Sequence, residues 1–406
     1  METTLAPSPS AYPPSAPGRL GIAHVVSAMG WGGMEARTLE TAQWQAEAGH
    51  HVVVITPENG RVHAEARARG LAVAAVDFAG KDKLASLRQM RRAIRDNGVR
   101  VADFHTNRSH ALGVIDLCAR VRSQHNLKTK APRGMRLNKE FPYSQFISTS
   151  EAAREALSVC GAVRASRISV VGEWADERFF APVTAPGDMG RLRQRLGLRP
   201  DGHVIGACAM MRRDNAFDDL IRATAILRGR GVEATCLLIG GPSETRREGC
   251  EQERQLRGLA TDLGVEDLVQ FLGHRGDVPD LFSAMDVATV VSRHTAQTRV
   301  GPEAAARGRP VVGFSVGALG ETVREGVTGR LVPLGDIYGF ATALERLLRS
   351  TAERQEMAEN AASFARRNFR QGPKMDRTLM VYRRALNPGQ AVRATDEAGL
   401  SLAPAA

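Results

Sequence analysis

Short apolar runs alternate with longer amphipathic segments along most of the chain. The first set predicts strands at 21–27, 51–56, 72–76 and 100–105, a helix from a glycine-rich loop to about Ala48, and a helix at 84–97. A second set predicts strands at 203–208, 234–239, 268–272, 287–291, 310–314 and 330–333, with helices at 217–230, from after residue 242 to about Leu263, at 352–369 and at 375–386.

Strands that alternate with amphipathic helices are typical of parallel sheets with crossover helices. Two serial sets predict an α/β fold with two Rossmann-like, doubly wound domains that face a cleft. In such sheets, ligands bind outside the carboxyl ends of the strands.

Glycine and proline residues interrupt the pattern between the two sets. Gly172, Pro182, Pro186 and Gly187 place the domain boundary there. We therefore expect a disordered extension over 1–19, a first domain over 20–170, a second domain over 171–373, a further helix over 374–386, and a disordered tail over 387–406.

Composition places the chain among ordinary globular proteins. Of its 406 residues, 43% are hydrophobic and 24% are charged, which excludes collagen, coiled-coil fibre and global disorder. No apolar run approaches the roughly 20 residues of a membrane-spanning helix, and the Pro- and Ser-rich N-terminal segment lacks the features of a secretory signal.

The five cysteines are widely spaced and form no C-x-x-C pair. We therefore expect a cytoplasmic protein without disulfides or structural zinc.

The net charge indicates an anionic partner. Lys and Arg number 55 against 44 Asp and Glu, which gives +11, so a phosphorylated metabolite, a membrane surface or nucleic acid comes into question. Only 5% of the residues are aromatic, which disfavours stacking on single strands, and we expect no nucleic-acid partner. Basic residues crowd the stretch between 105 and 145, which is either a solvated loop and helix face or a surface for anionic lipid: Arg120, Arg122, Lys128, Lys130, Arg133, Arg136 and Lys139.

An ordered series of motifs spans about residues 20 to 385. It begins with Gly32-Gly33-Met34-Glu35 and AGHHVVV at 48–54, and it ends with PEAAARGRPVVG at 302–313 and TGRLVP at 328–333. The series resembles the signature of GT-B glycosyltransferases, and of glycosyltransferase family 4 in particular. The resemblance implies that the first domain binds an acceptor, that the second binds a nucleotide-sugar, and that the last helix crosses back to the first domain.

The resemblance also implies the reaction. A sugar would pass with retention from a nucleotide-sugar donor to a lipid-linked or polysaccharide acceptor of the cell envelope, without a metal or other cofactor. The protein would then work in the cytoplasm, in peripheral contact with the inner face of the membrane. Negative charge grows on the leaving diphosphate, so backbone amides and cations must face it.

The donor loop matches the family pattern only in part. Glu303 falls on the family's glutamate for the nucleotide ribose; alternatively, it is a first-turn acid that complements a helix dipole. The preceding loop would turn its backbone toward the sugar and diphosphate through Gln297, Thr298, Arg299 and Val300. The glutamate that contacts the donor sugar is replaced by Thr295, and the glycine after it by Ala296.

The cations for the diphosphate are also substituted. The family's Arg and Lys fall on Met210 and Asn215, so we expect Arg212 to take the catalytic role and Arg213 to bind the donor; alternatively, both are merely solvated. Gly240 and Gly241, at the end of a predicted strand, are expected at the donor site.

Three further positions concern the first domain. Gly32 and Gly33 match the loop against the donor phosphates, or they form a tight turn that requires positive φ. His105 matches a catalytic histidine of the family, or it is a polar residue satisfied within the fold. A second family histidine, near the donor sugar, is placed at Ala131.

Other functions stay open at this point. The substituted donor residues favour a catalytically degenerate protein that binds or supports an active glycosyltransferase. A GT-B sugar-nucleotide epimerase or sugar phosphate transferase has the same two domains, but the 302–310 signature fits it less well.

Overall fold

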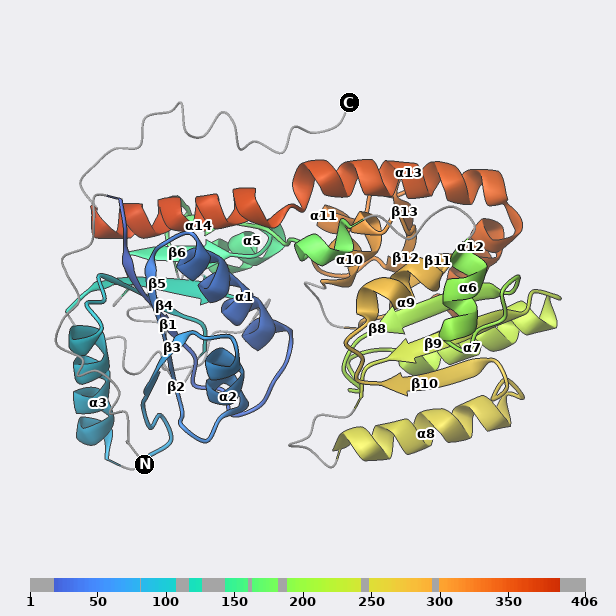
Figure 1. Ribbon diagram of the computed structural model, residues 1–406. Helices are drawn as coiled ribbons and strands as arrows, with labels where there is room; N and C mark the ends of the chain where they lie inside the picture. The colour runs from blue at the N-terminus through green and yellow to red at the C-terminus, as the bar shows by residue number, and fades with distance from the viewer. Residues whose placement is uncertain are drawn as a thin grey trace.

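The computed structural model describes residues 18–80, 82–106, 117–125, 143–159, 163–181, 188–241, 248–293 and 299–387. Two parallel sheets lie side by side, each between helices (Figure 1). Their strand orders are those of doubly wound α/β domains, so the predicted fold class is confirmed.

The first sheet has seven strands in the order β3-β2-β1-β4-β5-β6-β7. The chain reverses its winding direction between β1 and β4, which places a ligand crevice at their carboxyl ends. The strands are β1 (Gly21–Val25), β2 (His51–Thr56), β3 (Ala72–Ala75), β4 (Val101–Phe104), β5 (Ala119–Gln124), β6 (Gln145–Ser148) and β7 (Ile168–Val170). The helices are α1 (Gly33–Glu47), α2 (Arg61–Ala68), α3 (Lys83–Asp96) and α5 (Glu151–Val159), with short 3-10 turns at Ala165–Arg167 and Glu177–Phe179.

The second sheet has six strands in the order β10-β9-β8-β11-β12-β13. Here the reversal lies between β8 and β11. The strands are β8 (His203–Cys208), β9 (Ala234–Ile239), β10 (Val269–Gly273), β11 (Val287–Val290), β12 (Val311–Phe314) and β13 (Gly329–Val332). The helices are α6 (Asp188–Arg195), α7 (Phe217–Gly229), α8 (Glu248–Asp262), α9 (Val278–Ala284), α10 (Val300–Ala306), α11 (Leu319–Thr322), α12 (Ile337–Arg349) and α13 (Thr351–Asn368).

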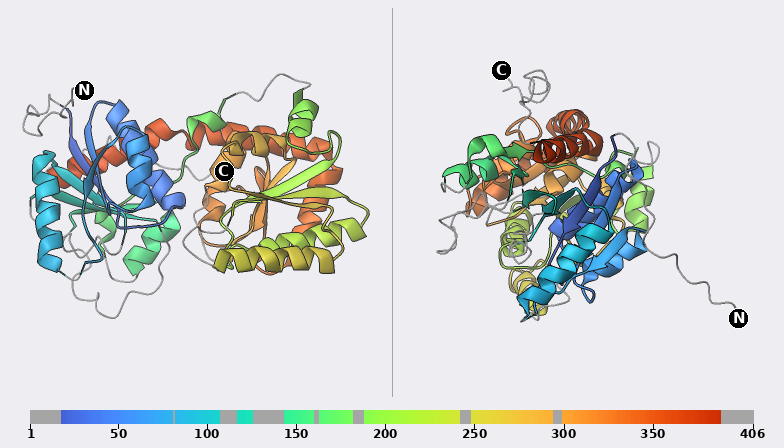
Figure 2. Two further views of the ribbon diagram at one scale, coloured as in Figure 1. Left: turned by 60° about the horizontal axis from the view of Figure 1, so that its bottom comes forward. Right: turned by 90° about the vertical axis from the view of Figure 1, so that its left-hand side faces the viewer.

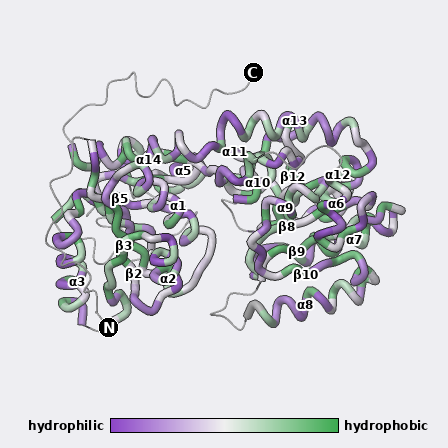
Figure 3. The backbone as a smooth tube through the Cα atoms, viewed as in Figure 1, coloured by the Kyte–Doolittle hydropathy of each residue, from purple (hydrophilic) through white to green (hydrophobic). Residues whose placement is uncertain are grey.

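Buried parallel strands explain the predicted apolar runs. Both faces of such a sheet are covered by helices, so its central strands are hydrophobic almost throughout. In β2, the residues Val53 to Ile55 have no exposed surface, and the same holds for Val204 and Ile205 in β8. Figure 3 shows these strands as hydrophobic segments beneath more polar helices.

Helix α14 (Gln371–Leu386) leaves the second domain and lies along the first (Figures 1 and 2). Its buried side chains join the core formed by β1, β2 and α1: Leu379, Val381, Tyr382 and Ala385. The backbone N–H of Ala175 donates to the Phe369 carbonyl at 2.9 Å. The last helix therefore crosses back and completes the first domain.

Strand β5 was not predicted, and it corrects the interpretation of the basic stretch. Its sequence is ARVRSQ, and it pairs with β4 and β6 inside the sheet. Arg122 is buried, and its guanidinium donates to the Thr106 carbonyl at 2.7 Å. The expectation of a solvated loop or a lipid-facing surface is therefore wrong for Arg122. The other members of the stretch, except Arg120, lie outside the described residues: Lys128, Lys130, Arg133, Arg136 and Lys139.

The segments expected to be disordered fall almost wholly outside the described ranges, which begin at Gly18 and end at Asn387. Within those ranges, no helix is both long enough and apolar enough to cross a bilayer.

Candidate active site

The carboxyl-end edges of the two sheets meet at the domain interface. Gly32 follows β1, and a Cβ at this position would lie 3.3 Å from Cε of Met210, which follows β8. Burial raises the pKa of Glu35, in the first turn of α1, and the Arg212 guanidinium opposes this shift. The two domains therefore contribute to one site, where α/β sheets bind their ligands.

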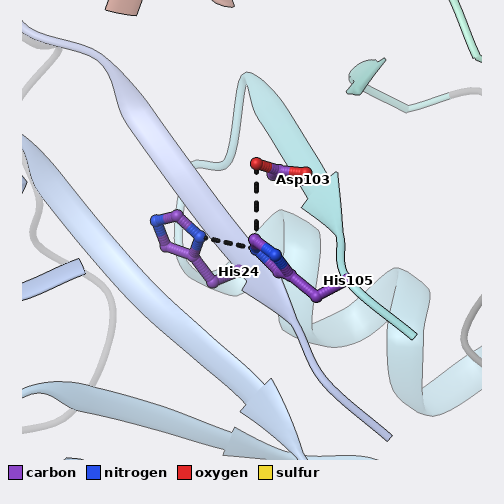
Figure 4. A group of neighbouring side chains, drawn as sticks. All are labelled: His24, Asp103 and His105. Carbon is purple, nitrogen blue, oxygen red and sulfur yellow. Dashed lines mark hydrogen bonds and ion pairs between the residues drawn. The ribbon is translucent and has the colours of Figure 1, made fainter. Parts of the chain in front are cut away.

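Three histidines of the first domain form a hydrogen-bonded chain at this edge. His24 Nδ1 lies 3.0 Å from His105 Nε2, and His105 Nδ1 lies 2.9 Å from His125 Nε2. At the inner end, His24 Nε2 lies 2.9 Å from Oε1 of Gln45 on α1. We call Gln45, His24, His105 and His125 the histidine chain. Figure 4 shows the pair His24 and His105, with Asp103 beside His105.

Asp103 is buried next to the histidine chain. Its Oδ2 lies 3.7 Å from His105 Nε2, and the same oxygen accepts hydrogen bonds from the Ser123 hydroxyl at 2.8 Å and the Tyr382 hydroxyl at 2.7 Å. Its Oδ1 accepts from the Ser123 backbone N–H at 3.0 Å. Three donors from β5 and α14 therefore hold this carboxylate as an acceptor.

The histidines of the chain are held in the neutral form. Burial lowers the pKa of His24, and burial together with His24 and Arg122 lowers the pKa of His105 well below its ordinary value. Burial and the neighbouring His105 lower the pKa of His125 to about 3. For His24 and His125, desolvation penalises the imidazolium more than the Asp103 carboxylate stabilises it.

His105 is enclosed between the two other histidines. Both of its ring nitrogens are engaged by other histidines, and only 6% of its surface is exposed. The alternative of a polar residue satisfied within the fold agrees with these contacts. The catalytic role that the family resemblance implies for His105 is not tested by them and stays a prediction.

The cluster also contains residue types that bind metal ions. Within the described ranges, His24, Asp103 and His105 bring ligand atoms to within 4.8 Å of one another. The hydrogen bonds above already account for each of these atoms, and Asp103 is satisfied by three donors. The expectation of a metal-independent protein is not tested by these contacts and stays a prediction.

The Tyr382 hydroxyl gives the first prediction. Tyr382→Phe should lower the free energy of unfolding by about 1–3 kcal/mol, because the buried Asp103 carboxylate loses one of its donors. Chemical denaturation measures this loss. The matched control is Tyr338→Phe, since Tyr338 is 71% exposed and its change should stay within about 0.5 kcal/mol. Equal stability of both variants would show that the bond to Asp103 contributes nothing.

A cluster of ion pairs joins the domains at the other side of the site. Arg299, which directly precedes α10, donates to Glu303 in the first turn of that helix at 3.0 Å, and its Nη2 lies 2.8 Å from Glu40 on α1. Arg37, also on α1, is buried and donates to Glu173 and to the Trp174 carbonyl. Glu303 is buried, which raises its pKa, while Arg299 and Arg37 lower it. Glu303 and Arg299 thus lie at the interface, where the family resemblance placed a donor site.

A glycine is required at position 32 because neighbouring side chains approach its backbone closely. Gly32 has φ of −168°, which is extended backbone, so the alternative of a left-handed turn is wrong for this position. A Cβ at Gly32 would be 3.2 Å from Glu35 Oε2 and would also crowd Met210. Gly33 begins α1, and a Cβ there would meet open space.

Met210 and Asn215, which stand where the family has an arginine and a lysine, make other contacts. Met210 contacts Gly32 across the interface, and the Asn215 side chain donates to the Met210 carbonyl at 2.7 Å. Arg212 and Arg213 are exposed in the same loop. The Arg213 carbonyl accepts from Arg293 at 3.0 Å. The positive charge of the loop after β8 is therefore carried by Arg212 and Arg213.

Gly240 has a structural requirement of its own. Its φ of 118° lies in the region that favours glycine, and a Cβ would lie 2.0 Å from the Ala209 carbonyl oxygen. At Gly241, a Cβ would lie 3.0 Å from the His274 ring. Gly240 lets β9 end closely against the loop after β8, and Gly241 lies against His274, which follows β10, at the edge where a donor was expected.

Several predicted positions lie outside the described residues: Asn107, Ala131, Thr295, Ala296, Gln297 and Thr298. Val300 is described and buried at the start of α10. His125 is the histidine that directly follows β5, the next strand after His105. The placement of the second family histidine at Ala131 is not tested, because Ala131 lies outside the described residues.

Sequence reasoning missed most of the histidine chain and of the ion-pair cluster. One signal was present, because His24 stands inside an apolar strand, GIAHV, and a buried polar residue requires a partner. Gln45 and Tyr382 lie on helix faces with no such mark.

Two protein-family models match this chain, one over each of the two domains. The family model described as Glycosyltransferase Family 4 matches residues 31–178, and that of Glycosyl transferases group 1 matches residues 202–350. A D-inositol 3-phosphate glycosyltransferase of Actinosynnema mirum is 35% identical over 228 residues, which cover 55% of this chain and 53% of that protein. Its counterpart in Mycobacterium marinum is 35% identical over 248 residues, 59% of this chain and 50% of that protein. The chain spans about half the length of these curated relatives.

Solved structures show the same two-domain fold. A glycosyltransferase from Rickettsia africae has a TM-score of 0.81 at 16% identity, covering 91% of this chain and 99% of that one. Anabaena HepE in complex with UDP-glucose has a TM-score of 0.76 at 22% identity, covering 89% and 98%. At these identities, the similarity concerns the fold.

Proposed function

The chain belongs to the family 4 glycosyltransferases with the GT-B fold, and on this premise we propose that it transfers a sugar from a nucleotide-sugar to an acceptor hydroxyl. The second domain would bind the donor, and the first would bind the acceptor. The relatives are named for an inositol phosphate acceptor. For this chain we propose a different acceptor class, lipid-linked or polysaccharide, with retention at the anomeric carbon and no metal.

The observation that carries this proposal is the buried Glu303 carboxylate at the interface. It lies in the first turn of α10, at the carboxyl edge of the second sheet, and Arg299 and Arg37 stabilise its charge. A carboxylate held in this way can accept hydrogen bonds from both hydroxyls of a ribose. The exposed Arg212 and Arg213 follow β8 at the same edge, and cations there would stabilise a leaving diphosphate.

Charge on α3 supports a peripheral contact with anionic membrane. Its inner side buries Met90, Ala93 and Ile94. Its outer side exposes five cations, each contributing roughly 1 kcal/mol near anionic lipid: Lys83, Arg88, Arg91, Arg92 and Arg95.

Calorimetric titration tests the donor site directly. The purified chain should bind UDP or GDP saturably, and it should release that nucleotide from the matching sugar conjugate when an acceptor is added. Phosphate-free buffer and a titration with uridine, which lacks the diphosphate, serve as controls. Absence of binding up to roughly millimolar nucleotide, far weaker than a typical enzyme KM, would overturn the proposal.

A second candidate is a binding partner of an active glycosyltransferase. It is favoured by Met210 and Asn215, which stand uncharged and engaged where the family has cations. This candidate expects saturable nucleotide binding with no release of nucleotide from any sugar conjugate, whereas turnover by the chain alone would exclude it.

A further inference from the structure

Three arginines line a cavity at the outer edge of the first sheet, between α5 and α14. We propose that this cavity binds a phosphate group through the guanidinium groups of Arg154, Arg377 and Arg384. It lies at β7, the outermost strand, and β5 and β6 stand between β7 and the crevice at β4. The cavity is therefore separate from the proposed donor site, and the proposal does not depend on transferase activity.

The walls of the cavity come from the end of the first domain and from the last helix. Helix α5 contributes Arg154, the 3-10 turn before β7 contributes Ser166, and β7 itself contributes Ser169. Arg377 and Arg384 are seven residues apart on α14, which is about two helical turns, so both lie on the same face of that helix. All three arginines are half-buried. Cationic side chains from two helices therefore converge on one space.

Positive charge exceeds negative charge on these walls. Glu151 is the only carboxylate among the described lining residues, and its Oε2 lies 2.6 Å from Nε of Arg154. The side chains of Arg377 and Arg384 make no hydrogen bond or ion pair within the described part of the chain. Burial lowers the pKa of Arg377, the Glu151 carboxylate opposes this shift, and the charge of Arg384 adds to it. An anion between the two guanidinium groups removes their mutual repulsion.

Uncharged groups that can donate hydrogen bonds complete the cavity. The hydroxyls of Ser166 and Ser169 have no hydrogen-bond partner among the described residues, and a hydroxyl can donate as well as accept. Because β7 is the last strand in the sheet order, one side of its backbone has no partner strand there. The cavity thus combines guanidinium, hydroxyl and backbone donors, which suits an anion with several oxygen atoms.

The beginning of α5, beside this cavity, already binds one anionic group. The backbone N–H groups of Glu151 and Ala152 donate to the two carboxylate oxygens of Glu321, each at 2.9 Å, and the N–H of Ala153 donates to the Ser150 hydroxyl at 3.0 Å. These N–H groups are therefore occupied, and the guanidinium groups must hold the proposed ligand. The positive end of the α5 dipole still favours negative charge in this neighbourhood.

Phosphate is the class of anion that fits these donors. Guanidinium groups bind phosphate oxygens through paired, charge-assisted hydrogen bonds. A single-stranded nucleic acid is disfavoured, because no aromatic side chain is among the described residues that line the cavity. The phosphate belongs either to a soluble compound or to the headgroup of a lipid, and both sources present the same chemistry to the three arginines.

Calorimetric titration of the full chain with inorganic phosphate tests the site. Arg377→Gln combined with Arg384→Gln should weaken phosphate binding by roughly tenfold or more, because two charged donors are lost. The matched control combines Arg366→Gln with Arg383→Gln. It removes the same charge from two exposed arginines that do not line the cavity, and it should bind phosphate as the wild type does.

All three proteins carry Arg212→Gln and Arg213→Gln in this titration, so that phosphate at the proposed donor site does not contribute. Equal affinity in the wild-type cavity and in the Arg377→Gln, Arg384→Gln variant would overturn the proposal. An equal loss in the control, or no phosphate binding by the wild-type cavity, would do the same. If the double change prevents folding, Arg384→Gln alone takes its place. Phosphate should then raise the Tm of the unchanged cavity more than that of the variant, and equal shifts would contradict the site.

Lipid vesicles distinguish the two sources of the phosphate. The proteins are sedimented with phosphatidylcholine vesicles that contain phosphatidic acid. If the cavity variant binds fewer vesicles than the charge-matched control, the phosphate is that of a lipid headgroup. If the two variants bind vesicles equally and differ only toward inorganic phosphate, the ligand is a soluble phosphorylated compound. Both results support a phosphate site at α14, which the titration alone can refute.

Discussion

Acidification from about pH 7.5 to about pH 5.5 should lower the free energy of unfolding by up to about 4 kcal/mol. The pKa values of His24, His105 and His125 are all depressed in the folded protein, mainly by burial. As the pH falls through about 6.5, the unfolded chain therefore binds protons that the folded chain does not. Each neutral histidine then costs up to about 1.4 kcal/mol per pH unit, and the loss continues until the folded pKa is reached.

Denaturant titrations at several pH values measure this slope, with the combined fluorescence of Trp31, Trp44 and Trp174 reporting on unfolding. His105→Gln should reduce the acid-induced loss by about 1.4 kcal/mol, because one depressed group is removed. Buried carboxylates such as Glu303, whose pKa is raised, act in the opposite direction, but they contribute equally to wild type and variant. Identical slopes in the two proteins would mean that the histidines are charged in the fold.

Glu303→Gln should weaken UDP affinity by about 30-fold or more. The loss corresponds to about 2 kcal/mol for hydrogen bonds to a charged acceptor, at about 1.4 kcal/mol per tenfold. If Glu303 merely complements the dipole of α10, the same variant should change stability by about 0.3–1 kcal/mol and leave UDP binding intact. Calorimetry and denaturation of one preparation distinguish the two roles.

Glu40→Gln is the matched control for this experiment. Glu40 contacts the same Arg299 at 2.8 Å, but it comes from α1 of the first domain. Its removal loosens the pair between the domains and leaves Glu303 in place, so UDP binding should change by much less. Equal losses in the two variants would assign the effect to Arg299 or to domain geometry, and the ribose role of Glu303 would be withdrawn.

The sequence predicts most of the two sheets because burial on both faces gives strands such as HVVVIT at 51–56 an unmistakable apolar run. It fails at β5, where ARVRSQ has the composition of a surface loop. Arg122 is accommodated there because the Thr106 carbonyl accepts its hydrogen bond and because Tyr143 and Asp103 favour its charge. Periodicity detects apolar burial, and it does not detect a buried polar group whose partner comes from another strand.

The candidate site is predictable only where one motif contains it. Glu303 and Arg299 stand four residues apart on the chain, and a family signature reaches both. The histidine chain depends on the register of β1, β4 and β5 and on a helix at the other end of the sequence. Tyr382 and Asp103 are 279 positions apart, so no local pattern links them. Only the packing of α14 on the first sheet brings the pair together.

The path of α14 also fixes the order in which the protein can mature on the ribosome. The first sheet ends with Val170, but the helix that buries Leu379 and Tyr382 against it begins at Gln371. Synthesis runs from the N-terminus, and domains generally fold as they emerge. Here the domain made first must wait, with part of its core uncovered, until the second domain has been translated. The older half therefore completes its core only after the newer half has been synthesised.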